Sequence, residues 1–464
     1  MPERLGALLR FWFTFEEPVD RRRYLLHGVG LMVGKYAVDA AVVLLVTGRF
    51  WSPLDYVNPV WTARQAQLAR PAWLMLVIAL WTLPFLWIGV SMTMRRAVNA
   101  GHSAWLSLLF FVPFANYLVM LWLATAQSGL RVPQYQRAEQ EVPDAKLRDA
   151  LIAMGAGLAV AIPTVLLSVL VVKSYSTPLF LGTPFSLGAI GAYVLNRDQV
   201  RTLGYTLQVT LAGLVLLAGA IILFAVEGLV CVLMALPIAG AVALIGAVLG
   251  RALARFSPGA APVGPGAMLA IALPVLTVVD ALPSPPPPIP LPPRLEHRVV
   301  TAVAIDAPPA VVWRNVVSFA DLPEPTGWLF HTGIAYPKRA RIEGAGVGAV
   351  RYCEFSTGAF VEPITAWEAP RRLAFAIVEQ PAPMAELSPY PRVRAAHLNG
   401  YFQATNGEFE LVELPGGRTR LVGTTAYQVR MYPQWYWSVF ADAIVERIHG
   451  RVLEHIERLS EQER

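Results

Sequence analysis

Residues 1–282 are dominated by long runs of apolar side chains, which short polar segments separate. Most of the runs reach the roughly 20 residues that an α-helix needs to cross a hydrocarbon core about 30 Å thick. The pattern therefore predicts a polytopic α-helical membrane bundle. With approximate bounds, the eight runs are 28–48, 72–92, 104–126, 151–172, 178–195, 207–226, 229–250 and 265–282.

From about residue 295 the pattern changes to an alternation of apolar and polar positions, which is typical of strands in a half-buried sheet. A helix is expected after the first strand, with Asp306 as its N-cap. A long amphipathic helix is expected from about Pro433 to Leu459, because apolar residues recur there at helical spacing. The strands are expected within 297–306, 348–355, 360–368, 371–379, 407–414 and 419–429.

The segment Pro283–Pro293 separates the two patterns and contains eight prolines. Proline removes the backbone donor and fixes φ, so this segment is expected to form a semi-rigid polyproline spacer. We accordingly divide the chain into membrane segments at 1–130 and 131–282, a linker at 283–293 and a second domain at 294–464.

Composition agrees with a membrane protein, since 55% of the 464 residues are hydrophobic and only 15% are charged. Soluble domains average about 25% charged residues. The net charge of +6 comes mostly from cations in loops beside the apolar runs, so we expect no nucleic-acid partner. A cleavable signal peptide is not expected, because charged residues precede the first run. Cys231 and Cys353 lie on opposite sides of the linker, so we expect no disulfide between them.

The side of the membrane on which the second domain lies follows from the distribution of Lys and Arg, which favour cytoplasmic loops. If the N-terminus is cytoplasmic and every run crosses the membrane once, the extracytoplasmic loops hold more Lys and Arg residues than the cytoplasmic loops. If the third run turns back at Pro113–Asn116, the inner loops hold most of them. We therefore expect a hairpin or re-entrant third run and an extracytoplasmic second domain. A kinked single span with a cytoplasmic domain is the alternative.

Two segments of the membrane part form a recognisable motif. FTFEEPVDRRRYLLHG runs from Phe13 to Gly28, and RRAVNAGHSAW from Arg95 to Trp105 links the second and third runs. Together they resemble the bacterial inner-membrane family called domain of unknown function 805, over roughly residues 10–130. The resemblance implies a multi-pass protein of the bacterial inner membrane and no biochemical activity. The acidic residue that usually follows the His of this motif is missing at the matching position.

The second domain resembles the polyketide cyclase/dehydrase branch of the START-like superfamily. The resemblance is carried by IDAPPAVVW near its start and AIVERIHGRVLEHI in its last helix. It implies an α+β helix-grip fold, in which an antiparallel sheet is clamped by the long C-terminal helix. Members of this superfamily bind apolar or amphipathic small molecules between sheet and helix, and only some are enzymes.

Strand alternation gives candidates for the ligand site, since residues two apart share one face of a strand. We expect the lining to include Tyr352, Glu354, Phe375, Tyr427 and Trp437. For each of them, ordinary core packing explains the residue type equally well. The segment 380–400 is long for a connection between strands and carries four prolines, so we expect it at the mouth of the pocket.

Polar residues allow an enzymatic interpretation, in which Glu354 or His397 acts as a general base. Glu362, Glu379 and Glu386 are further carboxylates of this domain, but a nucleophile motif does not accompany them. His449 and His455 are six residues apart and lie on different faces of a helix, so they do not predict a metal pair. We expect neither a metal nor a cofactor.

Charged residues within the membrane part are few. Lys35 and Asp39 are four residues apart on one helix face, where they neutralise each other. Glu227 lies between two apolar runs and is expected to mark the turn of a helical hairpin. A structural role for these residues is favoured over transport.

The sequence thus favours a multispanning protein whose second domain binds an apolar small molecule or lipid at the bilayer. The alternatives are a membrane-anchored cyclase, hydratase or hydrolase, and a transporter or sensor. The ligand, protein partners and oligomeric state do not follow from the sequence.

Overall fold

The computed structural model describes residues 2–15, 17–53, 73–111, 115–129, 147–256, 275–277, 296–318, 321–390 and 395–463. They form two compact units. The first unit consists of Met1–Leu167, Pro178–Ala218 and Pro237–Pro292, and the second of Ser168–Thr177, Gly219–Leu236 and Pro293–Arg464. The predicted proline spacer and nearly all of the eighth apolar run lie outside the described residues.

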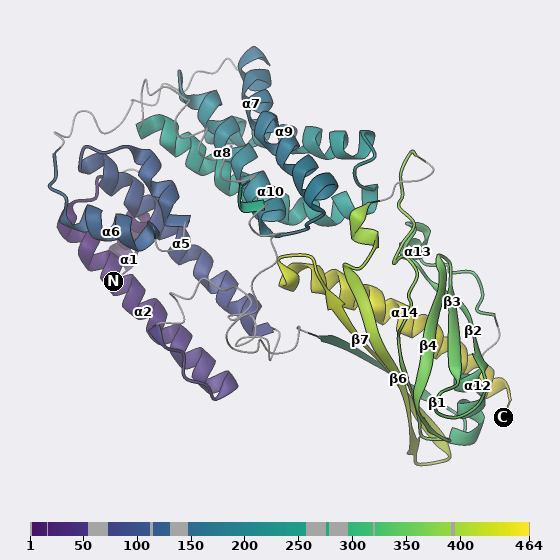
Figure 1. Cartoon of the computed structure of the whole chain (residues 1–464). Helices are drawn as coiled ribbons and strands as arrows, with labels where there is room; N and C mark the ends of the chain where they lie inside the picture. Colours follow the sequence, from purple (N-terminus) through teal and green to yellow (C-terminus); the bar gives the residue numbers. More distant parts are fainter. Residues whose placement is uncertain are drawn as a thin grey trace. The chain divides into compact units, whose positions relative to one another are not determined.

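The described part of the chain up to Phe256 is helical (Figure 1). Five of its helices are long and apolar enough to cross a membrane, namely Arg21–Thr47, Leu147–Val172, Pro178–Asn196, Leu203–Leu223 and Leu229–Phe256. The predicted helical membrane bundle is therefore confirmed. Its elements are α1 (Pro2–Phe13), α2 (Arg21–Thr47), α5 (Trp73–Asn99), η1 (Ala104–Phe111), α6 (Ala115–Thr125), α7 (Leu147–Leu166), η3 (Leu167–Val172), η4 (Pro178–Gly182), α8 (Thr183–Asn196), α9 (Leu203–Leu223) and α10 (Leu229–Phe256).

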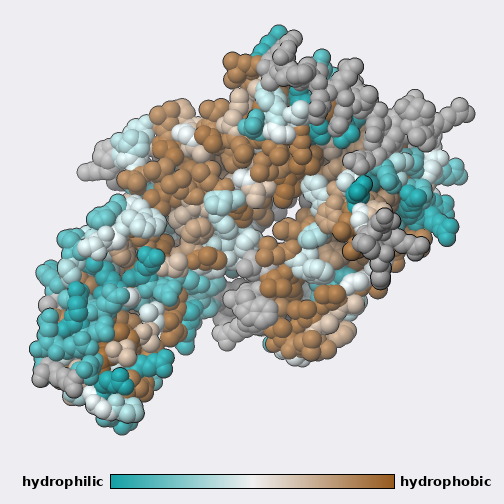
Figure 2. Space-filling view, turned by 180° about the vertical axis from the view of Figure 1, so that it is seen from behind, coloured by the Kyte–Doolittle hydropathy of each residue, from teal (hydrophilic) through white to brown (hydrophobic). Residues whose placement is uncertain are grey.

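Large apolar side chains are exposed along these helices, including Leu45, Val171 and Val215. Large contiguous apolar patches are rare on soluble monomers, so such a surface indicates a hydrocarbon environment. Figure 2 shows hydrophobic residues spread over the helical part, whereas the surface of the sheet domain is largely hydrophilic.

The third apolar run does not form one continuous helix. It is divided between the 3₁₀-helix η1 and the α-helix α6, which contact each other. Residues 112–114, which include Pro113 where the sequence predicts a turn, lie outside the described residues. The extracytoplasmic position of the second domain stays a prediction.

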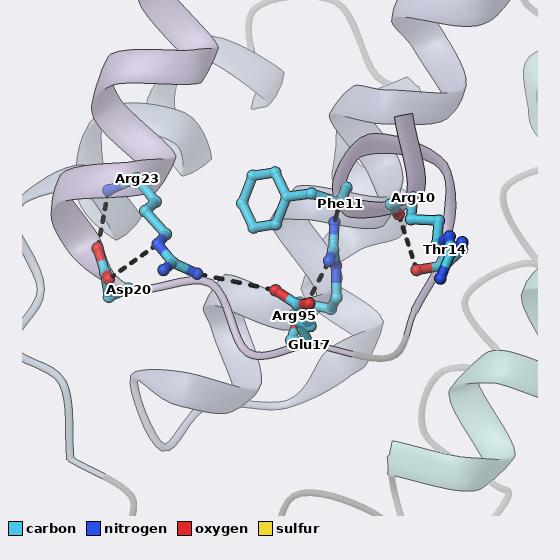
Figure 3. A network of polar contacts seen from close by, with 7 residues as sticks. All are labelled: Arg10, Phe11, Thr14, Glu17, Asp20, Arg23 and Arg95. Carbon is cyan, nitrogen blue, oxygen red and sulfur yellow. Dashed lines mark hydrogen bonds and ion pairs between the residues drawn. The ribbon is translucent and has the colours of Figure 1, made fainter. Parts of the chain in front are cut away.

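Arg95 and Arg96 begin the motif segment that links the second and third apolar runs, a position that predicts a loop. In the structure both residues lie near the end of α5 and are fully buried. Arg95 donates from Nη2 to the carbonyl of Phe11 at 2.6 Å and from Nη1 to that of Glu17 at 3.2 Å (Figure 3). Arg96 donates from Nε to the carbonyl of Leu123 at 3.0 Å. Helix C-termini leave carbonyls without partners, and the two guanidinium groups supply donors to the ends of α1 and α6.

The charge pair predicted in the first run is formed, since Lys35 Nζ contacts Asp39 Oδ2 within α2. Both side chains are largely shielded, with 13% and 3% of their surface exposed. Each charge therefore has an opposite charge beside it, which favours the structural role over transport.

The second unit is built around a seven-stranded antiparallel sheet with the strand order β1-β7-β6-β5-β4-β3-β2. The long helix α14 crosses one face of this sheet and contacts β1 and β7 (Figure 1). This arrangement confirms the predicted helix-grip fold. The elements are β1 (His297–Ile305), α12 (Pro309–Val317), α13 (Trp328–His331), β2 (Pro337–Glu343), β3 (Val350–Phe355), β4 (Gly358–Glu368), β5 (Arg372–Ala376), η5 (Ala396–Leu398), β6 (Phe402–Leu414), β7 (Arg418–Val429) and α14 (Gln434–Gln462).

Several details differ from the sequence prediction, including β6, which begins at Phe402 and not at residue 407. The strand β2 was not expected, and β5 ends at Ala376 although Glu379 makes an isolated bridge to Val361. The N-cap of α12 is Pro308, not Asp306. Asp306 lies three residues before the first helical residue, too far away to accept from the first free N–H groups of the helix.

The core of this unit lies between α14, α12 and the concave face of the sheet. Leu373 of β5, Leu421 of β7 and Ile456 of α14 are all fully buried there. The C-terminal part of α14 is thus packed against side chains, and the space under its N-terminal part is available for the site described next.

Candidate functional site

A cavity of about 240 Å³ lies between the sheet and α14 in the second unit. Phe375 and Phe409 of the sheet line it, together with Trp437 and Ile444 of α14. The segment 380–384 and His397 contribute a further wall, so the long connection at 380–400 borders the cavity. The residue types of the wall are mostly apolar, as in sites for small apolar ligands.

One polar pair is buried in this wall. Arg351 of β3 and Glu362 of β4 form an ion pair, with only 3% and 6% of their side chains exposed. The guanidinium carbon of Arg351 lies 4.8 Å from the ring centre of Phe375, which adds a cation–π contact. Burial raises the pKa of the Glu362 carboxyl, and the attraction of Arg351 opposes this rise.

A second polar group surrounds His397. Its Nδ1 is 2.9 Å from Oε2 of Glu227, and its Nε2 is 3.0 Å from Oε1 of Glu386. The same Nε2 is 3.1 Å from Sγ of Cys231. The Cys231 thiol also lies 3.4 Å from Glu386 Oε1. One thiol, one imidazole and two carboxylates therefore meet within 4.8 Å of one another.

Local structure explains how these side chains meet. Glu227 lies in the turn between α9 and α10, as predicted, and Cys231 follows one helical turn later in α10. The backbone N–H of Leu229 donates to the carbonyl of Leu387 at 2.9 Å, which holds the loop that carries Glu386 against this turn. A Cβ on Gly228 would lie 1.6 Å from Oε2 of Glu386, so a larger residue here would force the Glu386 side chain to move.

The electrostatics of the cluster follow from burial and close partners. Burial by itself lowers the pKa of His397, but hydrogen bonds to Cys231, Glu227 and Glu386 outweigh it and raise the pKa to about 12. The imidazole then carries a positive charge that the carboxylates balance. Burial and the charge of Glu227 raise the pKa of Tyr175, whose hydroxyl donates to Oε1 of Glu227.

The structure brings two of the predicted binding residues to the cavity, Phe375 and Trp437. Tyr427 is fully buried beside the wall, where its hydroxyl donates to Asp442 and its ring stacks on Phe402 at 5.1 Å. Binding by any of these residues remains a prediction.

The placement of Tyr352 and Glu354 in the cavity is wrong. Both lie on the other face of β3, where Glu354 pairs with Arg339 at 2.7 Å and Tyr352 packs under the guanidinium of Arg341 at 4.6 Å. Arg351 and Cys353 occupy the inner face instead. Alternation predicted that Tyr352 and Glu354 share one face of β3, but it did not fix which face points inward.

Of the two candidate general bases, His397 lines the cavity and Glu354 does not. Glu227 and Cys231 were not among the predicted site residues. The signal that could have indicated them is a single carboxylate in a long apolar stretch, with a thiol four residues later.

Two family comparisons agree with this architecture. Residues 12–137 match the family described as "Protein of unknown function (DUF805)". Residues 296–461 match the family described as "Polyketide cyclase / dehydrase and lipid transport". Both predicted resemblances are confirmed. The two matches leave the part from 138 to 295 without an assigned family.

Several solved structures are similar to the START-like domain at low identity and low TM-score. The Zhui aromatase/cyclase of Streptomyces sp. R1128 is 18% identical, with 36% of this chain and 94% of that chain covered and a TM-score of 0.26. A protein of Nitrosospira multiformis is also 18% identical, covering 36% and 100%, with a TM-score of 0.23. Truncated norcoclaurine synthase of Thalictrum flavum is 11% identical, covering 35% and 92%, with a TM-score of 0.23. No curated protein matches the chain.

Proposed function

We propose that the START-like domain binds an apolar or amphipathic small molecule, such as a lipid, in the cavity beneath α14, and that the apolar helices keep this domain at a membrane. The observation that carries the proposal is the cavity of about 240 Å³ with its largely apolar wall. The buried Arg351–Glu362 pair provides a polar position that can orient a ligand.

The size of the cavity supports a ligand larger than a solvent molecule. An apolar cavity of about 150 Å³ is known to stay dry and to bind benzene. The cavity here is larger, so a ring with a short chain, or part of an acyl chain, fits its volume. Each Å² of apolar ligand surface removed from water contributes about 25 cal/mol to binding.

The alternatives receive less support. For the enzymatic alternative, Glu354 faces away from the cavity, which leaves His397 as its candidate. For transport, the charges of Lys35 and Asp39 contact each other within one helix.

The test fills the cavity with a bulky side chain, introduced by a substitution in α14. Ala441 lines the cavity, whereas Ala443 lies two residues further on and is exposed. The full chain and the variants Ala441→Trp and Ala443→Trp would be purified in detergent and extracted with organic solvent, and the extracts would be compared by mass spectrometry.

We expect the wild type and Ala443→Trp to carry the same apolar species at a similar amount per chain. Ala441→Trp should carry at least tenfold less, because the indole occupies the ligand's place. Equal amounts per chain of every extracted apolar species in all three folded proteins would refute the proposal.

A further inference from the structure

The cluster around His397 has the geometry of a metal site with three ligands. Sγ of Cys231, Nε2 of His397 and Oε1 of Glu386 form a triangle with sides of 3.1, 3.0 and 3.4 Å. Bonds of about 2.0–2.3 Å to tetrahedral zinc place neighbouring ligand atoms roughly 3.3–3.8 Å apart. An ion would therefore need to spread this triangle by only a few tenths of an ångström.

A further layer of side chains holds the imidazole. Glu227 Oε2 lies 2.9 Å from Nδ1 of His397, so a carboxylate stands beside the ring nitrogen that does not face Cys231 and Glu386. Tyr175 in turn donates to the other oxygen of Glu227. Carboxylates commonly hold zinc-bound histidines in this way, fixing the tautomer and the ring orientation.

Without a metal ion, the hydrogens of the cluster cannot satisfy all of its buried polar atoms. Nε2 can carry one hydrogen, yet it faces both a thiol and a carboxylate at about 3 Å. Oε2 of Glu386 is buried without a hydrogen-bond partner in the described part of the chain. The Glu386 side chain is only 1% exposed. Burying a carboxylate in this way is costly, and a cation bound at Oε1 would offset the negative charge of the group.

The donor types indicate which ions fit. Magnesium and calcium prefer sites built from oxygen ligands. A thiolate and an imidazole together favour a softer divalent ion, of which zinc is the most suited to a mixed S, N and O set. The thiolate and the two carboxylates would offset the charge of such an ion.

We propose that Cys231, Glu386 and His397 bind a divalent transition-metal ion of the zinc type, and that Glu227 is the positioning residue for His397. Cys231 and His397 also line the cavity, so the ion would lie at the cavity wall with its fourth position toward that space. Closed structural sites use four protein ligands, whereas three protein ligands leave a position for water or a ligand.

The first experiment measures metal content. The full chain would be purified in detergent without chelator, loaded with Zn²⁺ or with Mg²⁺, desalted and analysed by inductively coupled plasma mass spectrometry. We expect about one Zn²⁺ per chain and no retained Mg²⁺. Cys231→Ser should lose the ion, and Cys353→Ser is the matched control because it changes the other cysteine.

A second measurement covers the case in which Cys231→Ser fails to fold. Glu386→Gln keeps the shape of the side chain and should weaken Zn²⁺ binding in a competition with a chromogenic chelator. Glu227→Gln should weaken it by about 10–100-fold, as expected for a residue that holds a ligand. Loading with Co²⁺ should produce a thiolate charge-transfer band that Cys231→Ser removes and Cys353→Ser keeps.

Substoichiometric Zn²⁺ in the folded wild type with no cobalt–thiolate band would overturn the proposal. So would equal Zn²⁺ retention by the wild type and Glu386→Gln. These readouts do not depend on an apolar ligand, so a failed metal site and a failed cavity ligand are distinguishable.

Discussion

Acid should destabilise the START-like domain through His449. This residue lies on α14 and lines the cavity. Among the described residues, its ring nitrogens hydrogen-bond to two threonine hydroxyls, 2.8 Å from Thr425 and 3.2 Å from Thr301. Burial lowers the pKa of His449 from 6.5 to about 4. The folded protein therefore favours the neutral form of the His449 imidazole.

The sign follows from proton linkage. Between pH 6.5 and 4 the unfolded chain binds more protons at this site than the folded chain, so folding stability falls as the pH falls. His449 has no effect above pH 6.5, and its destabilising effect is complete below pH 4. A difference of 2.5 units between 6.5 and 4 corresponds to about 3 kcal/mol in all, of which about 2 kcal/mol is lost by pH 5.

The assay is urea unfolding of the full chain in a non-ionic detergent at several pH values between 8 and 4.5. Hydrogen–deuterium exchange of peptides from β7 and α14 reports on this domain. His449→Gln should remove about 2 kcal/mol of the loss between pH 8 and 5, relative to the wild type at each pH. The same substitution at the exposed His331 is the control and should leave the wild-type dependence. Equal pH dependence in the wild type and His449→Gln would refute the reasoning.

Two further predictions concern the buried ion pair and the position of the domain. Glu362→Gln leaves the Arg351 charge buried without its carboxylate and should cost about 3–5 kcal/mol of unfolding free energy, measured by the same urea assay. Glu354→Gln breaks a more exposed pair and should cost less than about 1 kcal/mol, and equal costs would contradict this assignment. A periplasmic alkaline phosphatase fused after Arg464 should be active if the domain is extracytoplasmic. If the phosphatase is inactive and a fluorescent protein fused at the same point fluoresces, the domain lies in the cytoplasm.

Most of the START-like fold could be predicted because its strands alternate regularly and its last helix has a clear apolar face. The strand β2 was missed because the segment from Pro337 to Glu343 is rich in charged residues, and only Ala340 and Ile342 are apolar and point toward the core. An edge strand of this kind is stabilised by its neighbour β3 and carries little pattern of its own.

The site was harder to predict than the fold. Alternation shows which residues of β3 share a face but not which face is inner, and the buried pair with Glu362 lies across two strands. The cluster around His397 joins residues far apart in sequence, since 166 positions separate it from Cys231. Periodicity reports on neighbours within one element, so the sequence could single out Glu227 and Cys231 as unusual residues but not their contact with His397.

The second compact unit is assembled from three separate stretches of the chain, and two of them, Ser168–Thr177 and Gly219–Leu236, precede the proline-rich linker. Cutting the chain at the linker would therefore not release this unit whole. A fragment beginning at Arg294 would lack Tyr175, Glu227 and Cys231, and so would leave His397 and Glu386 without their counterparts. Recombination at the linker, in evolution or by engineering, could move the sheet and α14 into another protein. The residues of the polar cluster that precede the linker would not move with them.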